Sequence, residues 1–178
     1  STLRLVDYAT LKPLASKVFR NVVQLYWDND SANLLLVTQD LISKIPITAS
    51  NTLSSHTIYR LNKNSQQAVL RFSRTLNSLI LTKEMDEFVV EKLDLQGVTS
   101  PIYTGKNRVS RIVALNNDND FILQLDNKVS REFVRLKQQK TNVLYQCSQL
   151  KKCSLSHYNP KSNNLIFRGF HTTDTLSL

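Results

Sequence analysis

The chain has 178 residues, of which 41% are apolar and 21% charged, a balance that suits a folded domain and excludes a disordered chain. Its 23 Lys and Arg residues against 14 Asp and Glu residues give a formal net charge of +9, which favours an acidic partner: a nucleic acid, an anionic membrane surface or an acidic protein. Apolar runs such as residues 34–37 are too short to cross a bilayer, so we expect no membrane span.

Neither the N-terminus nor the cysteines indicate secretion. No basic segment followed by an apolar stretch opens the chain, so we expect no signal peptide. The chain begins at Ser1, which suggests either a processed protein or a piece of a longer one. Cys147 and Cys153 are the two cysteines, and no histidine stands at a zinc-binding spacing from them. We therefore predict two reduced thiols in an intracellular protein, nuclear or cytoplasmic.

The first predicted element is a strand over residues 2–8, where apolar and polar side chains alternate. The next segment, residues 11–18, has a weak helical spacing, and Pro13 would suit a first helical turn. We expect this segment to be a connecting loop or a short helix.

The remainder of the chain repeats one pattern four times: an asparagine followed by a short apolar run. The repeats begin at Asn33, Asn77, Asn119 and Asn163, which are 44, 42 and 44 residues apart. Strand-like segments flank each run, so the pattern predicts units near residues 21–61, 68–104, 109–147 and 153–178, the last lacking a fourth strand. Four short strands in about forty residues are typical of a β-propeller blade.

The second unit, residues 76–95, resembles a WD40 repeat. Asp86 matches the acidic residue of the turn in that family, and Leu93-Asp94 stands where Trp-Asp is usual. The other units keep the regular spacing of the strands but lack the motif. The resemblance implies a propeller-like interaction module.

The fold class predicted is therefore all-β and β-propeller-like, with about four blade-sized antiparallel units in one domain, residues 1–178. Two arrangements follow: a small closed ring in which residues 2–8 supply the missing strand, or an arc of a larger propeller completed by a partner. In either case a lone monomer with both ends free should be unstable. The side chains expected to be buried between sheets are Leu79, Ile80, Phe88, Val90, Phe121, Ile122, Phe133, Leu165 and Ile166.

Catalytic chemistry finds no support in the sequence. His56, His157 and His171 belong to different units, and Glu84 and Asp86 share one turn that we expect to be solvated. We predict no enzyme activity, no cofactor, no metal and no small-molecule substrate.

Positive charge is expected on one propeller face. In a blade, the connection to the next blade and the turn between the second and third strands share that face. It would carry Lys63, Lys83, Lys106, Arg108, Lys128, Arg131, Lys151, Lys152 and Arg168. We predict a scaffold that assembles other protein subunits into a complex; the alternative is a nucleic-acid-binding module that uses the basic face.

Overall fold

The computed structural model of this protein describes residues 2–6, 9–47, 53–116, 119–148, 153–159, 161–168 and 173–177. The described chain is built of β-strands joined by turns, with one short 3-10 helix, η1 (Lys63–Ser65). It contains no helix that is long and apolar enough to cross a membrane. The all-β prediction is confirmed.

Four antiparallel sheets follow one another along the chain, and we call them blades 1 to 4. Blade 1 holds β3 (Val22–Trp27), β4 (Asn33–Thr38), β5 (Leu41–Pro46) and β6 (His56–Arg60). Blade 2 holds β7 (Ala68–Ser73), β8 (Ser78–Glu84), β9 (Phe88–Leu93) and β10 (Thr99–Gly105). Blade 3 holds β11 (Arg108–Ala114), β12 (Asp120–Asp126), β13 (Ser130–Lys137) and β14 (Lys140–Ser148). Blade 4 holds three described strands, β15 (Ser154–Asn159), β16 (Asn164–Arg168) and β17 (Thr173–Ser177).

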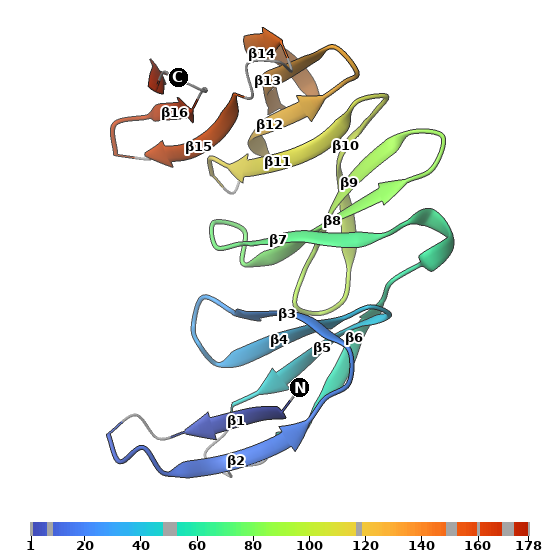
Figure 1. The fold of residues 1–178 in the computed structure, drawn as a ribbon, viewed down its shortest axis with the longest axis vertical. Helices are drawn as coiled ribbons and strands as arrows, with labels where there is room; N and C mark the ends of the chain where they lie inside the picture. Colours follow the sequence, from blue (N-terminus) through green and yellow to red (C-terminus); the bar gives the residue numbers. More distant parts are fainter. Residues whose placement is uncertain are drawn as a thin grey trace.

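A separate two-stranded sheet, β1 (Thr2–Val6) with β2 (Pro13–Val18), lies at the far end of blade 1 from blade 2 (Figure 1). Figure 1 shows the sheets stacked in chain order as an open arc. In the described chain β1 pairs only with β2, and β17 only with β16. The closed-ring alternative, with residues 2–8 in blade 4, is therefore wrong, and the arrangement is that of an arc.

The core consists of apolar layers between successive sheets. Alternate residues of each second strand serve opposite layers, because neighbouring side chains of a strand point to opposite faces. Leu35 and Val37 of β4 pack toward blade 2, whereas Leu34 and Leu36 pack toward the β1–β2 sheet. Blades 1 to 3 thus bury both faces of their second strands by stacking on neighbouring sheets, which explains the near-continuous apolar runs of these strands.

Seven of the nine side chains predicted to be buried are buried in the structure. The other two, Phe88 and Ile166, are half-buried. Phe88 opens β9 at the rim of blade 2. Ile166 lies between Leu165 and Phe167, which both pack toward blade 3, so it faces the side of blade 4 that no described sheet covers.

In blades 2 to 4 the backbone conformation explains why asparagine recurs in the repeat. Asn77, Asn119 and Asn163 have φ values of 46°, 56° and 55°, a left-handed conformation that asparagine tolerates better than most residues. In blade 1 the left-handed residue of this turn is Ser31, with φ of 56°, and Asn33 already belongs to β4. In blade 1 the asparagine of the repeat therefore stands two positions after the left-handed residue.

Two further expectations are wrong. Residues 13–18 form strand β2 and not a helix, because pairing with β1 decides their conformation and a proline is tolerated as the first residue of a strand. Cys147 and Cys153 are not free thiols but form a disulfide, which joins the end of β14 to the start of β15 and so ties blade 3 to blade 4.

Candidate functional site

The predicted basic face corresponds to one rim of the arc. In an antiparallel meander, the connection to the next sheet and the turn between the second and third strands lie at the same strand ends (Figure 1, right-hand side). The described members of the predicted set all lie at this rim: Lys63 in η1, Lys83 near the end of β8, Lys106 and Arg108 where β11 begins, Lys128 and Arg131 where β13 begins, and Arg168 at the end of β16. Lys151 and Lys152 lie outside the described residues.

Three of these cations are paired with acidic residues, of which Asp40 and Asp126 lie at the same rim and Glu91 lies within β9. The pairs are Lys63 with Asp40, Lys83 with Glu91, and Arg131 with Asp126, each at 2.6 Å. Arg131 also donates to the backbone carbonyl oxygen of Cys153 at 2.5 Å, so it joins blades 3 and 4. The Lys83–Glu91 pair is largely buried, with side chains 23% and 15% exposed. These three cations therefore form ion pairs within the fold.

The other four described cations, Lys106, Arg108, Lys128 and Arg168, are exposed and form no ion pair within the described residues. Arg108 and Lys128 belong to blade 3, Lys106 lies in the connection that leads into it, and Arg168 belongs to blade 4. The rim therefore offers exposed positive charges at blades 3 and 4.

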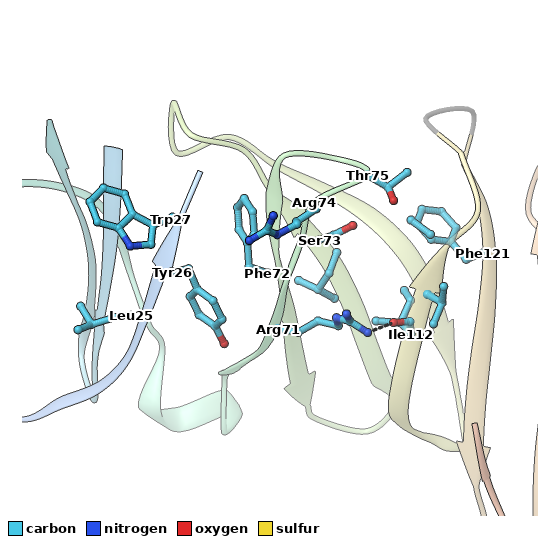
Figure 2. Close-up of a pocket in the computed structure, with 13 residues that line it drawn as sticks. Leu25, Tyr26, Trp27, Arg71, Phe72, Ser73, Arg74, Thr75, Ile112 and Phe121 are labelled. Carbon is cyan, nitrogen blue, oxygen red and sulfur yellow. Dashed lines mark hydrogen bonds between the residues drawn. The ribbon is translucent and has the colours of Figure 1, made fainter. Parts of the chain in front are cut away.

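A groove that the sequence analysis did not predict crosses the innermost strands of blades 1, 2 and 3. Its volume is about 470 Å³ (Figure 2). β3 contributes Leu25, Tyr26 and Trp27, and β7 with its following turn contributes residues 71–75. The far wall belongs to β11 and β12, including Ile112 and Phe121. One groove thus joins side chains that lie about 95 positions apart in sequence.

Arginine and aromatic side chains give the groove its chemistry. Arg71 donates to the backbone carbonyl oxygen of Ile112 at 3.0 Å, which ties blade 2 to blade 3 and holds the guanidinium in the groove. Arg74 is exposed and lines the same groove. The rings of Tyr26 and Phe72 stack with centroids 6.0 Å apart. Trp27, the single tryptophan of the chain, is 43% exposed.

Tyr26 is a neutral hydrogen-bond donor at this site. Burial raises the pKa of its hydroxyl above 10, and the nearby positive charge of Arg71 opposes that rise. The hydroxyl donates to Oε1 of Gln24 at 2.7 Å. The described residues that line the groove include Arg71 and Arg74 and no carboxylate. Such a surface suits a ligand that carries both carboxylates and apolar groups.

Sequence reasoning missed Arg71 and Arg74 because it placed charge by loops and not by strands. A β-bulge between Val69 and Arg71 shifts the register of β7. β11 has a bulge at the matching place, between Val109 and Arg111, and Arg111 donates to the carbonyl oxygen of Leu155 in blade 4. The signal available in the sequence was an arginine in the middle of the first strand in each of two units, Arg71 and Arg111.

The remaining candidates lie apart. His56 opens β6 of blade 1, whereas Glu84 ends β8 and Asp86 follows it in the turn of blade 2; all three are exposed. Among the described residues no group of three or more His, Cys, Asp or Glu residues is placed to hold a metal ion. His171 lies outside the described residues.

Comparison with known proteins identifies the fold but does not identify a family. No protein-family model matches the chain, and no curated protein matches it in sequence. Among solved structures, it is similar to the dihydro-heme d1 dehydrogenase NirN in complex with DHE, with 11% identity, 99% of this chain and 39% of that chain covered, and a TM-score of 0.58. The CNH domain of AfRom2 matches with 11% identity, 96% and 58% coverage, and a TM-score of 0.54. TolB from Acinetobacter baumannii matches with 14% identity, 98% and 45% coverage, and a TM-score of 0.52.

These similarities define the class of fold. NirN and TolB are β-propellers, and the chain shares their stacked four-stranded antiparallel sheets. The chain spans between 39% and 58% of the length of the three proteins it matches. It is a β-propeller-like protein, with the arrangement of an arc.

Proposed function

We propose that the chain is a non-enzymatic interaction module that holds an acidic, partly apolar polypeptide segment of a protein partner in the groove across blades 1 to 3. The observation that carries this proposal is the composition of the groove: its described lining holds two arginines, several aromatic side chains and no carboxylate, drawn from three sheets. A segment bound there contacts three blades at once and so depends on the folded arc.

The energetics favour a carboxylate ligand. A hydrogen bond from arginine to a carboxylate stabilises a complex by about 1.5–3 kcal/mol, more than a neutral hydrogen bond does. Arg71 is held by the Ile112 carbonyl, so binding orders it little further. Trp27, 43% exposed, gains burial when an apolar residue of the segment covers it.

The second blade supports a relation to WD40 repeats. Asp86 lies in the turn between β8 and β9, and Leu93 ends β9 directly before Asp94. Oδ1 of Asp94 accepts hydrogen bonds from the backbone N–H groups of Gln96 and Val98 at 2.9 and 2.8 Å. This acid orders the turn that follows the strand, a structural role in a repeat that serves interaction.

The alternative function is binding of a nucleic acid at the basic rim. The observation that favours it is the set of exposed cations without an ion pair in the described chain: Lys106, Arg108, Lys128 and Arg168. Phosphate binding by such residues releases counterions and weakens steeply with salt.

Fluorescence of Trp27 distinguishes the two functions, because it is the only tryptophan and it lines the groove. The ligands are a blocked peptide of alternating Glu and Leu, its Lys–Leu counterpart, and an oligothymidylate. We expect the Glu–Leu peptide to change the emission of Trp27 at physiological salt. Arg74→Glu should weaken that binding about tenfold or more, the loss expected for one charge-assisted hydrogen bond replaced by repulsion.

Lys128→Glu is the matched control, since it makes the same change of charge on the exposed rim. It should leave the binding of the Glu–Leu peptide within about twofold, as expected for a screened, distant charge. Equal weakening by both variants would mean that net charge alone attracts the peptide. Tighter binding of the oligothymidylate, lost in Lys128→Glu and not in Arg74→Glu, would establish the nucleic-acid alternative instead.

A further inference from the structure

A cleft lies between the outer strands of blades 2 and 3, and we call it the outer cleft. β10 and the turn after it form one wall, and β13 and β14 form the other. Its volume is about 640 Å³, and among the described residues it shares no lining side chain with the groove. Blades 2 and 3 each have four strands in the described chain, so both walls of the outer cleft are complete.

The floor of the outer cleft is apolar. Leu125, Val134 and Leu136 are 5%, 2% and 4% exposed and belong to the apolar layer between blades 2 and 3. Val143 of β14 pairs with Val134 and so lies on the same face of blade 3, but it is 56% exposed. Tyr103 of β10 packs against this layer from blade 2. An apolar side chain laid in the outer cleft would bury Val143 and extend the layer.

Glu132 supplies a negative charge at one end of this floor. It precedes Val134 and Leu136 by two and four positions in β13, so the three side chains lie on one face of the strand. The Glu132 carboxylate is half-buried and forms no ion pair within the described residues. The side-chain amide of Gln146 donates to its Oε1 at 3.5 Å. A carboxylate that is half-buried with such a long hydrogen bond gains from a bound cation.

The surroundings of Glu132 are negative although the chain is basic overall. Burial raises the pKa of Tyr103, a hydrogen bond with the backbone at Asn107 opposes that rise, and the charges of Glu132 and Glu87 add to it. The described lining of the outer cleft includes Glu132 and neither lysine nor arginine, whereas 23 of the 178 residues are Lys or Arg. The outer cleft therefore suits a cation beside apolar groups, the opposite charge to that which suits the groove.

We propose that the outer cleft binds an extended basic and apolar segment of a protein partner, with a lysine at Glu132 and apolar side chains two and four positions along over Val134 and Leu136. Alternate side chains of an extended segment share one side and rise by about 3.3 Å per residue, the same period as β13. In the described chain β10 and β14 each pair on one side only, so backbone groups beside the outer cleft can bond to such a segment. This site is additional to the proposed function, because it uses neither arginine of the groove.

The probe is a blocked peptide, Lys-Ser-Leu-Ser-Leu, titrated into the full chain by calorimetry. Its control carries N-acetyllysine in place of lysine, which removes the charge alone. We expect the acetylated peptide to bind about tenfold more weakly, the loss of one charge-assisted hydrogen bond. The methyl resonances of Leu136 and Val143 should shift on binding. The emission of Trp27 should not change, because Trp27 lines the groove and not the outer cleft.

Two pairs of matched variants test the site. Glu132→Gln should weaken binding of the lysine peptide about tenfold and leave binding of the acetylated peptide unchanged. Asp30→Asn, which removes the same charge from an exposed turn of blade 1, should leave both peptides unaffected. Val143→Lys should weaken binding of the lysine peptide about tenfold, because it places a positive charge in the outer cleft. Val129→Lys adds the same charge at a position 79% exposed on the rim and should change binding by less than about twofold.

Arg74→Glu should leave binding of the lysine peptide unchanged, which separates failure of this proposal from failure of the groove. Absence of binding at saturating peptide would overturn the proposal. So would equal losses in Glu132→Gln and Asp30→Asn, because net charge alone would then attract the peptide. Binding that changes the emission of Trp27 and leaves the Val143 methyl resonances unmoved would also overturn it, since the peptide would then lie in the groove.

Discussion

The substitution Gly97→Ala should destabilise the protein through a contact between blades. Gly97 lies in the turn between β9 and β10 with φ of +91°, and a Cβ built there would lie 2.3 Å from the carbonyl oxygen of Ile58 in β6 of blade 1. The same turn accepts a hydrogen bond from Lys44 Nζ at the carbonyl oxygen of Leu95, 3.1 Å away. This turn therefore holds blade 2 against blade 1.

Three terms set the magnitude. Alanine at a left-handed φ costs about 1–2 kcal/mol relative to glycine. The Cβ must move by about 1 Å to reach an ordinary carbon–oxygen contact of about 3.3 Å, and that movement endangers the Lys44 hydrogen bond, a further cost of about 1–2 kcal/mol. Alanine has a lower conformational entropy than glycine in the unfolded chain, and this offsets about 0.4–1 kcal/mol of the destabilisation. The expected loss in free energy of unfolding is about 2–3 kcal/mol.

Gly105→Ala provides the matched control. Its Cβ would also lie 2.3 Å from an atom, but that atom is the hydroxyl of Tyr103, at the far end of a side chain that can rotate, and φ at Gly105 is not positive. The expected cost is about 1 kcal/mol, that of a displaced rotamer. Urea unfolding followed by circular dichroism, with equal m values required for comparison, measures both. A Gly97→Ala variant as stable as the wild type, or less affected than Gly105→Ala, would refute the blade-to-blade contact.

Three further predictions concern the core, the disulfide and alkaline pH. Phe121→Ala, at a side chain 1% exposed between blades 2 and 3, should lower the free energy of unfolding by about 3–5 kcal/mol. Val129→Ala, at an exposed position, should change the free energy of unfolding by less than about 0.5 kcal/mol. Equal melting temperatures for the two variants would contradict the register of β12. Ellman titration of the denatured, unreduced protein should find no free thiol, and a reactive Cys153 in the wild type would disprove the disulfide. Cys147→Ser should lower the free energy of unfolding by about 2 kcal/mol, the value for a closed loop of about seven residues. Burial raises the pKa of Tyr26 above 10, so the folded state holds this proton more tightly than the unfolded state. The stability that is present below pH 10 should therefore be lost as pH rises through the folded pKa. Tyr26→Phe should reduce this fall of stability with pH in urea titrations, and an unchanged fall would mean that another group causes it.

The strands were predictable because their signals are local. β3 and β7 open the units predicted near residues 21–61 and 68–104, because apolar runs are bounded by residues that favour turns. The left-handed turn residues Asn77 and Asn119 gave the repeat its period. Blade 1 departs from this pattern because Ser31, two positions before Asn33, takes the left-handed conformation there.

Tertiary pairing decided the features that the sequence did not reveal. Residues 11–18 have a weak helical spacing, but residues 13–18 form β2 because a partner strand, β1, is adjacent. The disulfide requires β14 and β15 to approach, and the short spacing between the cysteines does not show this.

The candidate site was only half predictable. The topology of a meander places Lys106 and Lys128 on one rim, as expected. Which rim cations are neutralised depends on contacts such as Lys63 with Asp40, which join residues from separate turns. The groove could not be foreseen because a bulge sets the register of Arg71, and bulges leave no clear mark in a single sequence.

Photocrosslinking from the groove tests the proposed function most directly. A photoreactive amino acid replaces Thr75, which lines the groove, and in a matched protein replaces Val129 on the rim. In cells that produce the protein, the Thr75 position should crosslink to an acidic segment of a protein, identified by mass spectrometry, and the Val129 position should not. Crosslinks to nucleic acid from Val129, with none to protein from Thr75, would contradict the account.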